Sequence, residues 1–115
     1  MVKDIIVGAH YGLKDWLIQR ISAAVMAAYT VVFLILLLGQ ERLDFETWHA
    51  FMAGGFMRFL TFLFIVSLMY HAWVGVRDIW MDYVKPTGLR LTLHVLTLLA
   101  LVGYTGWAVS ILWRL

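Results

Sequence analysis

The chain has no cysteine, a single proline and few charges, and these shortages exclude several classes of protein. Without cysteine it cannot ligate an iron–sulfur cluster, form a disulfide or attach a c-type haem. It also has no glycine-rich phosphate loop after a predicted strand. Charged residues make up only 14% of the chain against 63% hydrophobic residues, too apolar a balance for an ordinary soluble domain. If the chain handles a metal or cofactor, its four histidines are the ligands to consider.

The hydrophobic residues gather in three blocks that carry no formal charge. The blocks are residues 21–39, 59–76 and 91–113, which contain 19, 18 and 23 residues. About 20 helical residues cross a bilayer core of about 30 Å, whereas membrane strands alternate apolar and polar residues over about 10 positions. The sequence therefore predicts an all-α membrane protein, a single domain over residues 1–115. Its three transmembrane helices are expected at about 17–39, 56–80 and 89–113.

The two connections between these blocks carry helix start and stop signals. Asp44 stands where a helix N-cap belongs, and apolar residues follow it at helical spacing until Gly54 and Gly55. This pattern predicts a short interfacial helix between the first two spans. Pro86 cannot continue a helix, so we expect the second span to end before it.

Basic residues are distributed unequally between the two ends of the predicted spans. The N-terminal segment and the second connection hold six of them, Lys3, Lys14, Arg20, Arg77, Lys85 and Arg90. The first connection and the C-terminus hold three, Arg42, Arg58 and Arg114. The positive-inside rule then predicts a cytoplasmic N-terminus and a periplasmic C-terminus. Because the N-terminus resembles neither a secretory signal nor a mitochondrial targeting peptide, we expect a bacterial inner membrane.

His71 is the titratable residue placed deepest in a predicted span. It lies six residues before Arg77, about 9 Å below the level of that charge at 1.5 Å per residue. A packed imidazole bonded to a backbone carbonyl or to Ser67 is one interpretation. The other is an axial haem ligand that binds iron through one nitrogen and donates from the other. Intramembrane titratable groups favour a functional role, and Gly75 would leave space beside the ring for a flat macrocycle.

The other histidines have weaker claims to a haem. His94 stands just inside Arg90, where such a ring commonly reaches the interface, and His10 and His49 lie outside the apolar blocks. The chain therefore offers one well-placed ligand, and a six-coordinate haem would need its second ligand from another protein.

Three further polar residues lie near the predicted cytoplasmic surface. Arg20 is placed either to extend to lipid headgroups or to pair with a buried anion such as a haem propionate. Asp82 and Tyr83 lie at the membrane surface, where an amphipathic aromatic ring is common. A protonated phenol there is also able to donate a hydrogen bond to a quinone carbonyl.

The string "HAWVGVRDIWMDYVKP", preceded by "GLKDWLIQRISA" and three spans of this length, closely resembles the D-type hydrophobic membrane anchor of bacterial succinate dehydrogenase, respiratory complex II. The resemblance covers nearly the whole chain. It implies that His71 ligates haem b, shared with a companion anchor of the C type, and that Arg20 lies near the propionates. It further implies that Tyr83 forms a hydrogen bond with ubiquinone and that Asp82 lies beside the ubiquinone site.

The same resemblance implies partners rather than independent catalysis. A flavoprotein subunit would oxidise succinate, an iron–sulfur subunit would carry electrons, and this chain would anchor both in membrane lipid, with no nucleic acid involved. An anchor of another quinone-linked enzyme such as fumarate reductase is an alternative. A cofactor-free membrane scaffold or small transporter, in which His71 only packs, is another.

Overall fold

The computed structural model describes the backbone of residues 2–115 and the side chains of residues 12–115. Within residues 2–115 the chain forms four α-helices and no strand. They are α1 (Val2–Leu38), α2 (Phe45–Ala53), α3 (Gly55–Tyr83) and α4 (Thr87–Arg114). In the same part of the chain, three segments are long and apolar enough to cross a membrane, Gly12–Leu38, Gly55–Tyr83 and Thr87–Arg114. The predicted all-α fold with a short helix between the first two spans is confirmed.

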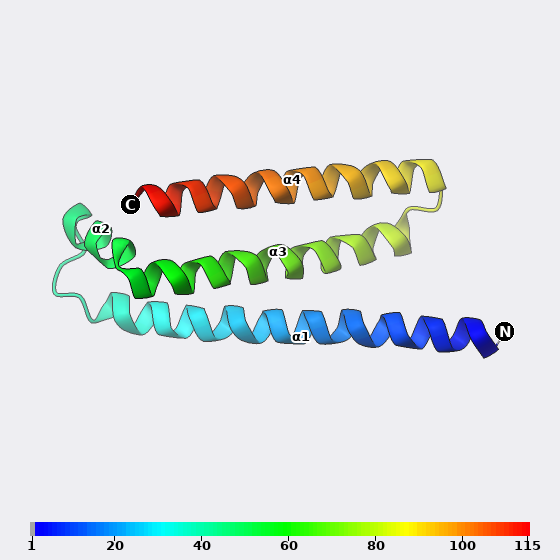
Figure 1. Ribbon diagram of the computed structural model, residues 1–115, viewed down its shortest axis with the longest axis horizontal. Helices are drawn as coiled ribbons and strands as arrows, with labels where there is room; N and C mark the ends of the chain where they lie inside the picture. The colour runs from blue at the N-terminus through cyan, green and yellow to red at the C-terminus, as the bar shows by residue number, and fades with distance from the viewer. Residues whose placement is uncertain (1) are drawn as a thin grey trace.

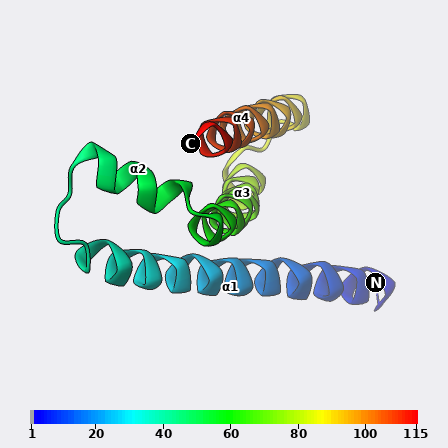
Figure 2. The same cartoon turned by 60° about the vertical axis from the view of Figure 1, so that its left-hand side comes forward.

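The three long helices run side by side with α3 between α1 and α4 (Figures 1 and 2). Successive long helices point in opposite directions, so the N-terminus and the α3–α4 connection share one end of the molecule (Figure 1). The α1–α2 connection, α2 and the C-terminus share the other end. The molecule measures 61 × 26 × 20 Å. Its long dimension exceeds the roughly 30 Å hydrocarbon core, so the helix ends extend into the headgroup regions on both sides.

The connections begin and end the helices as the sequence indicates. The Asp44 carboxylate accepts a hydrogen bond of 2.9 Å from the Thr47 backbone N–H and caps α2. That backbone bond, with a smaller contribution from the Thr47 side chain, lowers the pKa of Asp44 below its ordinary value of 3.8. At the other end, the α3–α4 connection comprises only residues 84–86, and Pro86 takes the N-cap position of α4.

Two helices begin earlier than the spans predicted from sequence, which were expected to start at about residues 17 and 89. α1 begins at Val2 and continues straight into the apolar block, because no proline interrupts residues 2–16 and single glycines are tolerated inside a helix. Thr87 and Gly88 belong to the first turn of α4 instead of the connection. Proline fixes its own φ near the helical value, which suits a helix that starts directly after it.

Few side chains are enclosed by this chain alone. Among residues 12–115, the buried side chains are Ser22, Met52, Met57, Val74 and Leu112. Large apolar side chains on all three long helices are exposed, including Leu38 at 75% and Phe56 at 67%. So much exposed apolar surface would be unstable in water, whereas lipid or partner helices would cover it. The chain is a multi-pass membrane protein whose outer surface requires such an environment.

Candidate functional site

His71 lies on α3 and faces α1, where its Nδ1 is 3.1 Å from the hydroxyl oxygen of Ser22. Ser22 is only 6% exposed, and its hydroxyl also lies 2.6 Å from the backbone carbonyl of Ile18 and 3.2 Å from that of Gln19. Ser67 was one partner that the sequence offered for a packed His71; the side-chain partner in the structure is instead Ser22, across the helix interface. His71 is therefore held from one side, through Nδ1, by a helix 49 residues away in sequence.

Two other polar contacts join α1 to α3 on either side of this pair. Toward the N-terminal end, the Arg77 guanidinium donates to the Asp15 carboxylate, with both side chains about one quarter to one third exposed. Toward the opposite end, the Tyr29 and Thr61 hydroxyls are 2.7 Å apart. Positions rise along α1 as their partners fall along α3, which is the register of two antiparallel helices. Ser22 and His71 thus lie in the middle of a fixed interface.

The space at Gly75 is occupied differently from the prediction. A Cβ built on Gly75 would lie 3.5 Å from Nε2 of Gln19 on α1, an ordinary van der Waals distance. The glycine therefore faces the neighbouring helix rather than an open space. Its absent side chain lets the Gln19 amide lie close to α3, one turn from His71.

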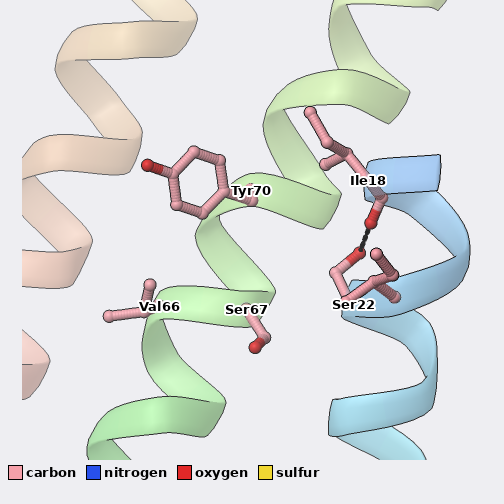
Figure 3. Close-up of a pocket in the computed structure, with 6 residues that line it drawn as sticks. Ile18, Ser22, Val66, Ser67 and Tyr70 are labelled. Carbon is pink, nitrogen blue, oxygen red and sulfur yellow. Dashed lines mark hydrogen bonds between the residues drawn. The ribbon is translucent and has the colours of Figure 1, made fainter. Parts of the chain in front are cut away.

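A groove of about 250 Å³ opens beside the Ser22–His71 contact (Figure 3). Its walls come from α1 and α3, and the lining residues are Ile18, Ile21, Ser22, Val66, Ser67 and Tyr70. Figure 3 shows the Ser22 hydroxyl turned toward the Ile18 carbonyl, and Ser67 extending from α3 between the two helices. Almost all of the surface that these residues present to the groove is apolar, so the groove suits a flat or elongated hydrophobic group more than a charged one.

His94 has different surroundings from His71. Its ring packs edge-on against Trp73, with centroids 5.9 Å apart. Nε2 of His94 is enclosed and has no hydrogen-bond partner among the described residues. Nε2 of His71 also has no hydrogen bond to a described residue, but it is not among the enclosed atoms. Of these two intramembrane rings, His71 has the nitrogen that an outside group is able to reach.

The remaining predicted residues do not gather around His71. Arg20 is exposed, stacks over Trp16 at 5.4 Å, and lies about 200° around α1 from Ser22. Asp82 and Tyr83 are exposed in the last turn of α3, and Tyr83 is about 18 Å along the helix axis from His71. The Tyr83 side chain is 80% exposed. The structure of this chain therefore contains two separate places, a half-buried imidazole within the span and a polar edge at one end.

Sequence reasoning missed Ser22 and Asp15 as partners of α3. Ser22 stands beside alanines in a stretch of small residues, a pattern that favours close helix packing and draws no attention to its hydroxyl. A usable signal was present, because Asp15, Ser22 and Tyr29 follow one another at intervals of seven residues and so share one face of α1. All three of these residues contact α3.

Within residues 12–115, no three or more side chains of histidine, aspartate or glutamate come together in a group suited to a metal ion. An axial haem ligand differs from such a cluster because the porphyrin supplies the other in-plane donors. A single histidine is enough for a ligand of that kind, so a cluster is not required.

Comparison with known proteins gives two concordant similarities. The family model described as succinate dehydrogenase/fumarate reductase transmembrane subunit matches residues 3–111. The chain is also 39% identical over 102 residues to the succinate dehydrogenase hydrophobic membrane anchor subunit of Coxiella burnetii, covering 89% of both chains. The resemblance inferred from the "HAWVGVRDIWMDYVKP" string is confirmed. The chain belongs to the family of succinate dehydrogenase/fumarate reductase transmembrane subunits.

Proposed function

We propose that this chain is the D-type membrane anchor of a bacterial succinate:ubiquinone oxidoreductase, and that His71 supplies one axial ligand to a haem b. The second axial ligand comes from a companion anchor of the C type. A flavoprotein and an iron–sulfur subunit bind at the cytoplasmic surface of the inner membrane. The chain itself is not catalytic alone, since it has neither the cysteines nor the nucleotide motifs for those centres.

The surroundings of His71 carry the proposal. The ring is half-buried within a helix long and apolar enough to span the membrane, and only Nδ1 is engaged by a neighbouring side chain. Nε2 is free of contacts with described hydrogen-bonding groups and is not enclosed. A neutral imidazole with one nitrogen bonded and the other free is the form in which histidine binds metal. The residues present therefore fit an axial haem ligand.

When bound, haem b supplies one-electron transfer within the bilayer. This chain's residues hold and orient that group. The apolar groove walls beside Ser22 would exclude water from a hydrophobic group bound there. For Arg20 the support is the resemblance and its exposed guanidinium, which has no acidic partner among the described residues. Because Arg20 lies on the opposite side of α1 from Ser22, a propionate bound to it would have to extend around α1.

The last turn of α3 would contribute to the quinone site. Tyr83 donates a hydrogen bond from its phenol to a carbonyl oxygen of ubiquinone, and Asp82 provides a carboxylate beside it. The Tyr83 side chain is 80% exposed in this chain, so its hydroxyl is available to a ligand held partly by other subunits. Companion chains would supply the remaining contacts, because Asp82 and Tyr83 project from the exposed last turn of α3.

Fumarate reductase is the second candidate, because the matched family includes anchors of both enzymes. One experiment tests the assignment and separates the two. The tagged chain is purified with its partners from native membranes, and the complex is assayed for succinate-to-ubiquinone and for quinol-to-fumarate electron transfer. A haem-containing complex with the faster rate toward ubiquinone supports the proposal. A faster rate toward fumarate selects the second candidate, and purification without a flavoprotein or haem overturns both.

A further inference from the structure

The contact between Ser22 and His71 bears on which nitrogen of the imidazole carries the proton. Ser22 is buried at the α1–α3 interface, and its hydroxyl is within hydrogen-bond distance of both a backbone carbonyl and an imidazole nitrogen. A hydroxyl has one proton to donate and two lone pairs that accept. The group that accepts the Ser22 proton therefore determines whether Nδ1 of His71 must donate or accept a hydrogen bond.

The proton of Ser22 goes to the Ile18 carbonyl. That carbonyl oxygen only accepts, and at 2.6 Å it is the nearest of the three partners of the hydroxyl. Serine in a helix commonly bonds back to the carbonyl four residues earlier. With the proton directed there, the lone pairs of the hydroxyl oxygen are left for Nδ1 of His71, 3.1 Å away. Nδ1 must then carry a proton, because two acceptors at this distance would repel each other.

The tautomer of His71 follows from this assignment. A neutral imidazole carries one N–H, so a proton on Nδ1 leaves the lone pair on Nε2. The hydrogen bond from Nδ1 also raises the electron density of the ring and makes Nε2 a stronger donor to a metal. Because the pairs Asp15–Arg77 and Tyr29–Thr61 fix the helix register on either side, Ser22 stays opposite His71.

We propose that Ser22 is a positioning residue for His71: its hydroxyl oxygen accepts the Nδ1–H, fixes the ring plane and keeps Nε2 free for haem iron. The inference rests on the proposed function, since it concerns the same haem. It assigns to Ser22 a chemical role that its size alone would not give, and that an alanine of nearly the same volume would lack.

The test compares four variants in the assembled membrane complex. Ser22→Ala removes the acceptor, Ser22→Cys replaces it with a weak sulfur acceptor, and Ser22→Thr retains a hydroxyl able to bond the same carbonyl. Thr30→Ala is the matched control, because the Thr30 hydroxyl bonds the Met26 carbonyl in the same way, at 2.8 Å, but has no histidine beside it. The readouts are haem content, the midpoint potential of the haem and the electron paramagnetic resonance spectrum of the ferric state.

Ser22→Ala is expected to weaken haem binding about 10- to 100-fold, the usual effect of removing the partner of a ligating histidine. It should also raise the midpoint potential, because a less electron-rich imidazole stabilises ferric iron less. Ser22→Cys should shift the potential in the same direction, and Ser22→Thr and Thr30→Ala should match the unmodified complex. If Ser22→Ala does not assemble, Ser22→Cys decides the question.

Three results would overturn the inference in distinguishable ways, with His71→Leu measured beside the other variants. Unchanged potentials and haem content in Ser22→Ala or Ser22→Cys, together with loss of normal haem in His71→Leu, would reject the role of Ser22 and leave the proposed function standing. Normal haem in His71→Leu as well would reject both. A change of equal size in Thr30→Ala would show that loss of the helix back-bond, and not the contact with His71, causes the effect.

Discussion

His71 and His94 differ in how accessible their Nε2 atoms are to a metal, because their surroundings differ. Both lie in helices long and apolar enough to span the membrane. His94 packs against Trp73 with its Nε2 enclosed, whereas His71 is bonded at Nδ1 and accessible at Nε2. An enclosed nitrogen packed beside an indole is less accessible to a metal than one at the surface of the chain. The free nitrogen of His71 is the atom on which the proposed haem site depends.

Tyr83→Phe tests the proposed quinone contact at the end of α3. The substitution keeps the ring and removes the hydroxyl, so it should cost one neutral hydrogen bond, about 0.5–1.5 kcal/mol, or roughly two- to tenfold in the affected step. The measurement compares electron transfer from succinate to ubiquinone with transfer to an artificial acceptor that bypasses the membrane site. Only the first rate should fall.

Tyr104→Phe provides the control for Tyr83→Phe. Tyr104 is also an exposed tyrosine, at 66%, but it lies on α4, away from the end of α3. Its substitution should change neither rate. Equal falls in both rates for Tyr83→Phe would indicate damaged assembly, and two unchanged rates would leave Tyr83 as an interfacial anchor.

The sequence makes His71 a candidate site residue because burying a titratable ring inside an uncharged, membrane-spanning block is costly unless the ring has a role there. The partner of His71 could not be predicted in this way. Whether the ring turns toward Ser67 on its own helix or toward Ser22 on α1 depends on the rotation of each helix, which the sequence does not show. The seven-residue spacing of Asp15, Ser22 and Tyr29 marks one face of α1, but spacing alone does not say which helix covers it. That choice depends on packing between segments far apart in the chain.

Polar side-chain contacts join the long helices, beside a small number of enclosed apolar side chains. In residues 12–115, α1 meets α3 through three polar side-chain pairs, and the Trp80 indole on α3 donates to the Thr97 hydroxyl of α4 at 2.9 Å. In a bilayer the apolar side chains gain little by leaving lipid for protein, so hydrogen bonds and close packing take a larger part in fixing register.

Asp15→Asn tests the ion pair that joins α1 to α3. The variant leaves the Arg77 guanidinium, about one quarter exposed, without its charged partner. We expect a loss of about 1–3 kcal/mol, between the values for exposed and fully buried pairs, measured as a lower thermal midpoint of the complex. The double variant Asp15→Arg/Arg77→Asp should recover part of the loss.

Arg42→Gln is the control for the pair between α1 and α3. It removes the ion pair of Arg42 with Asp44, where the two side chains are 80% and 42% exposed, and leaves the cap of α2 intact. The thermal midpoint should not change. An unchanged midpoint in Asp15→Asn too would mean that the pair between Asp15 and Arg77 adds nothing to the packing of α1 on α3.

Helix boundaries were predictable where the chain carries a chemical signal. Asp44 caps α2 and Pro86 separates α3 from α4, as expected from an acceptor side chain and a missing N–H. The beginning of α1 was not predictable in the same way. Residues 2–16 contain no capping box or proline to mark a boundary, so the helix extends through a mixed segment whose composition suggests a separate surface element.

The arrangement of the whole chain gives its two ends different charge. By their positions along the antiparallel helices, five basic residues lie toward the end shared by the N-terminus and the α3–α4 connection: Lys14, Arg20, Arg77, Lys85 and Arg90. Three lie toward the other end: Arg42, Arg58 and Arg114. The positive-inside rule predicts that the first end is cytoplasmic. The same end contains Asp82 and Tyr83, where the proposed quinone site would meet the soluble subunits.

Reporter fusions test this orientation. A reporter that is active only in the periplasm should be active after Leu115 and inactive before Met1, because three spans put the two termini on opposite sides. A cytoplasmic reporter should give the reverse pattern. Activity of the periplasmic reporter at the N-terminus would invert the proposed orientation, and activity at both termini would contradict three spans.

The most direct test of the account is the reduced-minus-oxidised absorption spectrum of the complex containing His71→Leu, beside one containing His94→Leu. Leucine retains an apolar side chain at each position but cannot bind iron. We predict that His71→Leu alters or abolishes the haem b signal, while the flavoprotein still oxidises succinate with an artificial acceptor. His94→Leu should leave the spectrum unchanged. A normal spectrum from His71→Leu would contradict the account and make His71 a packed histidine.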